Sequence, residues 1–170
     1  YGKENILDKM PPYQGGGEMI STVSFEKTIY NELPFKFEAG TPNVGGTLGL
    51  EAAVKYMQSI GIEAIARHED DLLKYGTKKL KEIKGLRIYS ESENKTGVIS
   101  LNLDKIHSYD AGTVIDKLGT AVRSGHSCTQ PLVDFYNVPG FIRASFAMYN
   151  TRHEIDKLVE AVIKSKEILS

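Results

Sequence analysis

Residues 141–163, FIRASFAMYNTRHEIDKLVEAVI, place a strand pattern directly before a helix pattern. Within residues 141–146, Ile142, Ala144 and Phe146 alternate with polar positions, which is typical of a half-buried strand. Thr151 and Glu154 then match a capping box, in which a hydroxyl and a carboxylate satisfy free amides at a helix start. The helix that follows carries one apolar stripe, formed by Ile155, Leu158, Val159, Val162 and Ile163. The segment therefore predicts a strand followed by a helix that covers a sheet.

The same mixture of strands and helices extends towards the N-terminus. We expect strands at residues 86–89, 97–103 and 120–123, a polar connection at 90–96, and helices at 62–84 and 110–118. A further helix should begin within residues 41–46 and continue to residue 57. Residues 1–46 should also contain two short strands, at 19–25 and 34–38. The predicted fold class is therefore α/β, with an α+β arrangement of a small sheet and covering helices in the second half.

The composition indicates a globular protein without a strong electrostatic preference. The 170 residues suffice for one ordinary domain or a compact pair of smaller regions, and 41% of them are hydrophobic and 25% charged. A net charge of −1 gives no reason to propose nucleic acid or an anionic membrane as a partner. No apolar run approaches the roughly 20 residues that span a bilayer. The single cysteine cannot form an internal disulfide, which favours the reducing cytoplasm.

That single cysteine, Cys128, is the first candidate for chemistry. A lone cysteine is more often a small buried hydrophobe than a nucleophile. Here Gly125 and Pro131 bracket a polar stretch, which predicts a loop, and Arg123 and His126 lie close in sequence. Positive charge nearby favours the thiolate form of a cysteine. The local context therefore favours a reactive thiol over a buried one.

Arg143 is the second candidate, because it lies inside an otherwise apolar strand. Strand alternation points its side chain away from Ile142 and Ala144. An arginine in this position requires an anionic partner, and a bidentate carboxylate is the usual one. The residues alone leave two interpretations open, a structural ion pair within the protein and a clamp for a substrate carboxylate.

Thr41 is the third candidate, as the N-cap of the helix that begins in residues 41–46. Free amides and the helix dipole make such a terminus a natural anion site, although an ordinary N-cap is the simpler interpretation. His68, His107 and His153 show no metal-ligand spacing with one another or with Cys128, so no metal site is predicted.

Five blocks occur in an order that resembles a known family. They are MPPYQGGGEMI (residues 10–20), FEAGTPN (37–43), IHSYD (106–110), RSGHSCTQPL (123–132) and RASFAMYNT (143–151). Together they span nearly the whole chain. The chain resembles the C-terminal part of the SufS-type, or group II, cysteine desulfurases and selenocysteine lyases. These are pyridoxal-phosphate (PLP) enzymes of the class-V aminotransferase family, with the fold of a fold-type I transferase.

The resemblance implies an activity and a role for each candidate residue. A homodimeric enzyme would convert L-cysteine to alanine and leave the sulfur as a persulfide on Cys128, for transfer to a SufE- or SufU-like acceptor and iron–sulfur cluster assembly. Arg143 would hold the substrate carboxylate, with Arg123 as a second arginine of the same pocket. Thr41, with Gly40, would reach the cofactor phosphate of the other subunit.

The sequence also departs from the family pattern. Ser127 and Thr129 stand where the family usually has histidine and alanine, so the preference between cysteine and selenocysteine stays open. No lysine lies in the Ser-x-His-Lys context that anchors PLP. We therefore expect a fragment that is inactive alone, with residues 1–58 as a remnant of the large PLP-binding domain and 59–170 as the small C-terminal domain. The alternatives are a selenocysteine lyase, another class-V lyase, or a non-catalytic module that binds a sulfur-transfer partner.

A fragment of this kind should expose apolar side chains near its N-terminus. Residues 1–46 would pack on a sheet outside the chain, and their apolar side chains would then face solvent or another copy. We expect this exposure for Met19, Ile20, Val23, Phe25 and Phe35.

Overall fold

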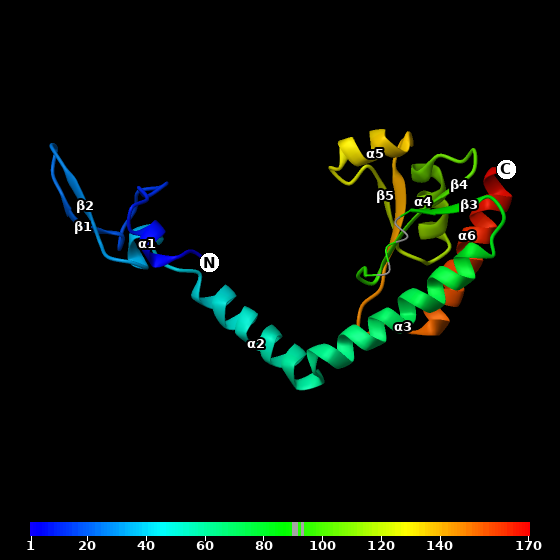
Figure 1. Ribbon diagram of the computed structural model, residues 1–170, viewed down its shortest axis with the longest axis horizontal. Coiled ribbons are helices and arrows are strands. Elements are labelled where there is room, and N and C mark those ends of the chain that lie inside the picture. Colours follow the sequence, from blue (N-terminus) through cyan, green and yellow to red (C-terminus); the bar gives the residue numbers. More distant parts are fainter. Residues whose placement is uncertain (90–91, 93) are drawn as a thin grey trace. The chain divides into compact units, whose positions relative to one another are not determined.

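The structure is a computed structural model that describes residues 1–89, 92 and 94–170 (Figure 1). The predicted polar connection at residues 90–96 lies partly outside the described residues. The chain divides into two compact units, Tyr1–Met57 and Gln58–Ser170. The predicted α/β fold class is confirmed, because both units combine helices with small antiparallel sheets.

The first unit contains a hairpin and several short elements. These are α1 (Glu4–Leu7), β1 (Ile20–Val23), β2 (Thr28–Tyr30), the 3-10 helix η1 (Phe35–Phe37) and most of α2 (Val44–Ile60). β1 and β2 pair antiparallel, with Ile20 opposite Tyr30. The strand predicted at 34–38 is wrong. Pro34 adopts a helical conformation there (φ −83°, ψ −13°), and its ring has no amide hydrogen for a strand ladder.

The start of α2 also differs from the prediction. The helix begins at Val44, and the side chain that satisfies its first turn belongs to Asn43, whose Oδ1 accepts a hydrogen bond from the Gly46 amide at 2.9 Å. Thr41 is therefore not the N-cap. Proline is accepted in the first turn of a helix but also occurs outside helices, so Pro42 does not by itself mark a helix start. Asn43, two residues after Thr41, is an equally good capping residue.

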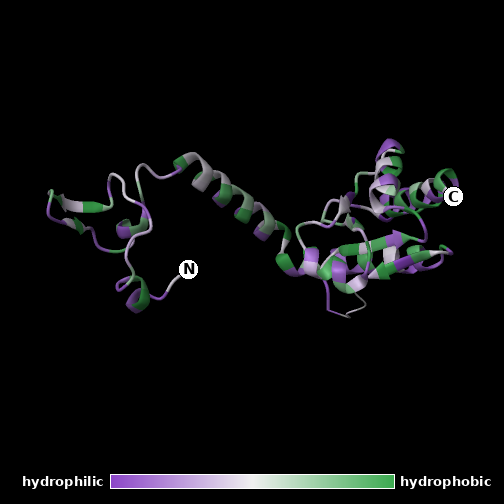
Figure 2. Cartoon of the chain, turned by 90° about the horizontal axis from the view of Figure 1, so that it is seen from above, coloured by the Kyte–Doolittle hydropathy of each residue, from purple (hydrophilic) through white to green (hydrophobic). Residues whose placement is uncertain are grey.

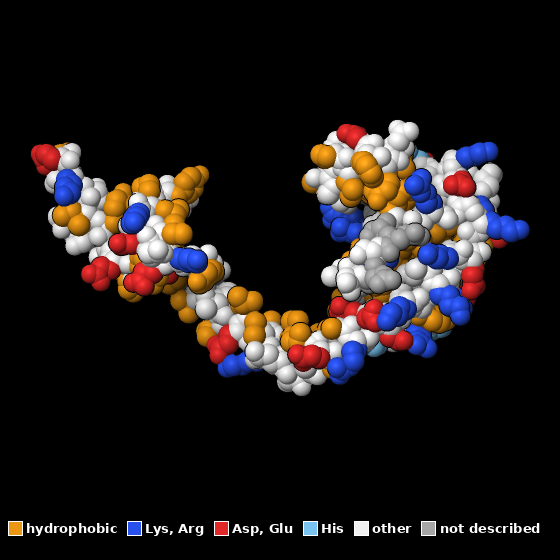
Figure 3. Space-filling view, viewed as in Figure 1, with side chains coloured by type: hydrophobic (Ala, Val, Ile, Leu, Met, Phe, Trp, Pro, Cys, Tyr) orange, Lys and Arg blue, Asp and Glu red, His pale blue; other side chains and the backbone are white. Residues whose placement is uncertain are grey.

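The first unit carries many hydrophobic residues along its backbone, drawn in green in Figure 2. Their side chains are largely exposed (Figure 3). Of the five named from the sequence, Ile20, Val23, Phe25 and Phe35 are exposed as predicted, with Phe25 fully so. Met19 is only 1% exposed, so that prediction was wrong. Residues along α2 are also exposed, although they include Leu48, Leu50 and Val54.

The second unit is a four-stranded antiparallel sheet with helices on both faces. Its elements are α3 (Ile62–Lys81), β3 (Leu86–Tyr89), β4 (Val98–Leu103), α4 (Ser108–Lys117), β5 (Arg123–Gly125), α5 (Gln130–Tyr136), β6 (Phe141–Ser145) and α6 (Arg152–Leu169). The strand order is β3-β4-β6-β5. The main core joins one face of the sheet to α3, α4 and α6, around Ile99, Leu101, Ile142, Leu158 and Val162.

The other face of the sheet carries a smaller cluster, which α5 completes. Tyr89 of β3 and Phe141 of β6 pack their rings edge to face at 4.8 Å, and Val133 of α5 is 2% exposed against them. The sequence did not predict α5, because Pro131 marked the segment as a loop. Proline in the first turn of a helix loses no hydrogen bond, and α5 uses it in that position.

The elements predicted from residues 141–163 are confirmed. Ile142 and Ala144 are buried and Arg143 is exposed, as strand alternation requires. Both hydrogen bonds of the Thr151–Glu154 capping box are present. The Thr151 amide donates to Glu154 Oε2 at 2.7 Å, and the Glu154 amide donates to the Thr151 hydroxyl oxygen. The strand predicted at 120–123 lies instead at Arg123–Gly125.

Candidate functional site

A row of polar side chains crosses the outer face of the sheet, opposite the main core. Arg123 of β5 is paired directly with Arg143 of β6, and Arg143 with Ser100 of β4. Tyr89 of β3 lies opposite Ser100 and completes the row. Because directly opposed residues of antiparallel strands share a face, the two guanidinium groups lie on the same side of the sheet.

No protein carboxylate offsets these two positive charges in the part of the chain that the structure describes. The salt bridges there involve Lys55, Lys74, Lys79 and Arg152, and neither Arg123 nor Arg143 takes part in one. The structural ion pair that the sequence left open for Arg143 is therefore not formed by the described residues. The arginine pair is open to an anion from outside the chain.

Cys128 lies in the turn that follows β5, three residues after Gly125. Its side chain is exposed, which confirms the loop predicted around it and excludes a structural role in the core. Ser127 and Cys128 both have positive φ angles, of 50° and 58°. The Cys128 amide donates to His126 Nδ1 at 3.3 Å. The strand that carries Arg123 thus leads directly into the turn that carries the thiol.

Two glycines, which were not predicted from the sequence, allow the close packing of β5 against its neighbours. A Cβ at Gly112 of α4 would lie 2.8 Å from Ser124 Cβ, and one at Gly140 would lie 2.8 Å from the Gly125 carbonyl carbon. Asn102 donates through Nδ2 to the Gly140 carbonyl at 2.8 Å. A glycine inside a predicted helix, as at Gly112, is the signal that could have indicated this close approach.

Gly40 and Thr41 belong to the first unit, whereas Cys128, Arg123 and Arg143 belong to the second. Gly40 has a φ of +83° and donates its amide to the Gly17 carbonyl at 2.9 Å. A Cβ at Gly40 would meet nothing within 4 Å, so the space beside this backbone is open. Thr41 is exposed.

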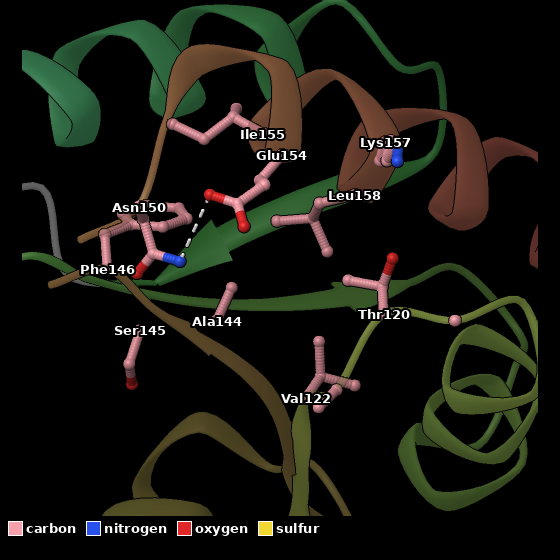
Figure 4. A pocket seen from close by; sticks show the side chains of 12 residues that line it. Thr120, Val122, Ala144, Ser145, Phe146, Asn150, Glu154, Ile155, Lys157 and Leu158 are labelled. Carbon is pink, nitrogen blue, oxygen red and sulfur yellow. Dashed lines mark hydrogen bonds between the residues drawn. The ribbon is translucent and has the colours of Figure 1, made fainter.

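A pocket of about 320 Å³ lies between the sheet and α6, away from these residues (Figure 4). Val122, Ala144 and Leu158 form its apolar walls. Among the described residues that line it, Glu154 is the one carboxylate, and it accepts hydrogen bonds from the Thr151 amide and hydroxyl at 2.7 and 3.1 Å. None of the predicted site residues lines this pocket.

Two of the histidines make contacts that belong to the fold. His107 caps α4 by accepting the Tyr109 amide on Nδ1 at 3.2 Å, and His68 Nε2 lies 2.9 Å from the Asn150 carbonyl oxygen. Among the described residues, no group of three or more His, Cys, Asp and Glu side chains could hold a metal ion. None of the helices in the described ranges is both long and apolar enough to span a membrane.

Comparison with known sequences identifies the family. The sequence model described as "Aminotransferase class-V" matches residues 1–158. The chain belongs to the aminotransferase class-V family. It is 46% identical to proteins named cysteine desulfurase from Escherichia coli O139:H28 and from Shigella flexneri, over 99% of this chain and 42% of each relative. The chain therefore spans about two fifths of the length of these relatives.

Solved structures of proteins named cysteine desulfurase show the same fold. The E. coli cysteine desulfurase CsdA, in an S-sulfonic acid form, superimposes with a TM-score of 0.93 at 35% identity, over 100% of this chain and 42% of CsdA. A cysteine desulfurase from Thermococcus onnurineus NA1 has a TM-score of 0.90 at 34% identity, over 99% of this chain and 42% of that protein. The lyase C-DES, at 18% identity, shares the fold, and one of its solved structures carries glycine linked to PLP. PLP is the cofactor expected of the aminotransferase class-V family, to which this chain belongs.

Proposed function

We propose that this chain is part of a PLP-dependent cysteine desulfurase that converts L-cysteine to alanine and leaves the sulfur on Cys128. The named relatives support this activity. One observation of the structure carries the proposal. The exposed Cys128 follows directly on the strand that pairs Arg123 with Arg143, and no described carboxylate offsets that pair.

The two arginines are suited to bind the carboxylate of an amino acid. A guanidinium group donates two parallel hydrogen bonds to a carboxylate, which fixes the orientation of the bound molecule. A bound anion also relieves the repulsion between two like charges that face each other across the strands. We assign Arg143 as the main carboxylate contact and Arg123 as the second.

Cys128 accepts the sulfur in this mechanism. Its Sγ, as thiolate, attacks the sulfur atom of the bound cysteine, so that an S–S bond forms and the substrate C–S bond breaks with its electron pair left on carbon. Protonation of that carbon yields alanine after release, and Cys128 carries a persulfide. When bound, PLP supplies the electron sink that makes this C–S cleavage possible.

Two residues of this chain, Gly40 and Thr41, fit the phosphate end of PLP. The open space beside the Gly40 backbone and the exposed Thr41 hydroxyl suit the oxygens of a phosphate group. We propose that they contact the phosphate of a cofactor held by the second subunit of a homodimer. The exposed apolar side chains of the β1–β2 hairpin support such an interface. The anchoring lysine is not among the residues of this chain.

The persulfide is a carrier form of sulfur, and its exposed position suits transfer to another protein. We propose a SufE- or SufU-like acceptor, a role in iron–sulfur cluster assembly, and action in the cytoplasm. In the same proposal, the unit Tyr1–Met57 derives from the large cofactor domain and Gln58–Ser170 is the small domain. Ser127 and Thr129 lie beside the thiol and differ from the residues that are usual in the family. Selenocysteine is therefore the alternative substrate.

Cys128→Ala in a longer form of the protein that supplies the PLP lysine tests the proposal. Alanine formation and protein-bound persulfide are measured with L-cysteine, and with selenocysteine in parallel. We expect both products from the unsubstituted protein with cysteine, and their loss by several orders of magnitude in the variant, as for other nucleophile deletions. Unchanged alanine formation in Cys128→Ala would disprove the role of this thiol. A preference for selenocysteine would assign the chain to a selenocysteine lyase.

A further inference from the structure

The turn that carries Cys128 has an unfavourable backbone conformation. A hydrogen bond from the Thr129 amide to the His126 carbonyl, at 2.9 Å, closes a four-residue turn. Ser127 and Cys128 occupy its two central positions, both with positive φ, which is the signature of a type I′ turn. Glycine, asparagine and aspartate dominate these positions, because other side chains are strained there. Neither central residue here is of a favoured type, so neighbouring contacts must hold the turn closed.

The Thr129 hydroxyl supplies such a contact. Its Oγ1 donates to the His126 carbonyl oxygen at 2.6 Å, so that this one oxygen accepts both the amide and the hydroxyl of Thr129. Together these bonds connect the last residue of the turn to its first. The Cys128 amide adds a longer bond to His126 Nδ1, at 3.3 Å.

The Thr129 hydroxyl bonds to the His126 carbonyl instead of capping α5. It is the N-cap of α5, where a threonine hydroxyl normally accepts an amide of the first helical turn. Its side chain makes no capping hydrogen bond to α5. Its carbonyl oxygen still accepts the amides of Leu132 and Val133, at 3.0 and 3.1 Å. Val133 is buried, so Thr129 connects the turn to a packed helix.

We infer that Thr129 is a positioning residue for Cys128, whose hydroxyl holds the His126–Thr129 turn closed and the thiol at its exposed corner. The inference rests on the proposed function of Cys128 and adds to it a role for the residue that follows the thiol. Thr129 touches neither substrate nor cofactor in this role. It acts only through the backbone of the turn.

Amide hydrogen exchange in the 170-residue chain tests the turn without cofactor or substrate. In Thr129→Val, which keeps the branched shape and removes the hydroxyl, the Cys128 and Thr129 amides should exchange about threefold to tenfold faster, the change expected for the loss of one net hydrogen bond. Thr129→Ser should retain the protection. Thr113→Val is the matched control, because it removes an equivalent hydroxyl-to-carbonyl bond from α4, at 2.9 Å. Equal exchange in the unsubstituted chain and in Thr129→Val would overturn the inference.

Kinetics in the longer form, which supplies the PLP lysine, separate positioning from substrate binding. Thr129→Val should lower kcat for alanine formation by about threefold to tenfold and leave KM for cysteine within about twofold, with recovery in Thr129→Ser. A rise in KM at unchanged kcat would contradict the inference. If Cys128→Ala retained full activity, the proposed function would fail instead, and the exchange result would stand by itself.

Discussion

Arg123 and Arg143 are directly opposed across β5 and β6, with their side chains on the same face of the sheet. The Cβ atoms of such a pair lie about 4.5–5.5 Å apart, so two like charges there destabilise the sheet. In the described ranges no carboxylate compensates for them. The pair therefore lowers the stability of the free protein, and a bound carboxylate would restore it.

Replacing one arginine should consequently stabilise the free chain. We expect Arg143→Gln to raise the free energy of unfolding by about 0.2–1 kcal/mol at low ionic strength, and less at high salt because salt screens the repulsion. Urea denaturation at two salt concentrations measures the effect. Arg67→Gln, on the exposed surface of α3, is the control for a simple change of net charge. A loss of stability in Arg143→Gln would show that the guanidinium makes a stabilising contact.

The same substitution should impair the reaction. Hydrogen bonds between charged groups are worth about 1.5–3 kcal/mol, so Arg143→Gln should lower kcat/KM for cysteine by about tenfold to a hundredfold in a longer form that supplies the PLP lysine. A stabilised but less active variant is typical of a residue selected for function rather than for folding. Unchanged kcat/KM would remove Arg143 from the proposed carboxylate site.

The close packing of α4 on β5 predicts the effect of a single methyl group. Gly112→Ala would place a Cβ 2.8 Å from Ser124 Cβ, so α4 and β5 must move apart. We expect a loss of about 1–3 kcal/mol in the unfolding free energy of the second unit, measured by urea denaturation. Gly49→Ala in α2 is the control, because nothing lies within 4 Å of its Cβ and alanine favours a helix. Equal effects of the two substitutions would contradict the packing argument.

The capping box of α6 predicts a pH dependence of stability. Hydrogen bonds from the Thr151 amide, then from its hydroxyl and from Asn150, hold the pKa of Glu154 below its ordinary value. A carboxyl group with a lowered pKa stabilises the fold above its unfolded pKa and loses this contribution as the pH falls through the folded pKa. The difference in unfolding free energy between the unsubstituted chain and Glu154→Gln should therefore be largest near neutral pH and shrink in acid.

Denaturation at several pH values measures this difference, and Glu160→Gln on the exposed surface of the same helix is its control. Thr151→Ala removes the other half of the box and should cost about 1 kcal/mol at neutral pH, the usual value for the loss of an N-cap. A pH-independent difference for Glu154→Gln would mean that the carboxylate contributes no more than an amide in the same place.

The sequence predicted those elements whose signals are local and strong. The strand with Ile142 and Ala144, the capping box at Thr151 and the stripe of α6 all follow from periodicity and side-chain chemistry within a few residues. The strand at 34–38 failed because Pro34 adopts a helical conformation. The helix α5 was missed because proline signals both loops and helix starts.

The candidate site was predictable as a set of residues but not as an arrangement. Cys128 and Arg143 could be selected from their local context, whereas the pairing of Arg143 with Arg123 depends on strand register between segments far apart in the chain. The role of Asn102 likewise arises only from contacts made in three dimensions, whereas a glycine inside the predicted helix gave a local signal at Gly112. The capping of α2 by Asn43 rather than Thr41 shows that two good capping residues in one segment cannot be separated by sequence alone.

The 170-residue chain alone should not bind PLP at a defined site. No lysine here lies in the Ser-x-His-Lys context that the proposed function assigns to the PLP anchor, so added PLP should react only with scattered surface lysines. Absorbance titration should then show no band that saturates at one cofactor per chain, and borohydride reduction followed by mass spectrometry should find the label spread over several sites. Alanine should not form from cysteine. A saturating one-to-one band together with alanine formation would show that another lysine can anchor the cofactor, because a defined stoichiometry requires a single built site.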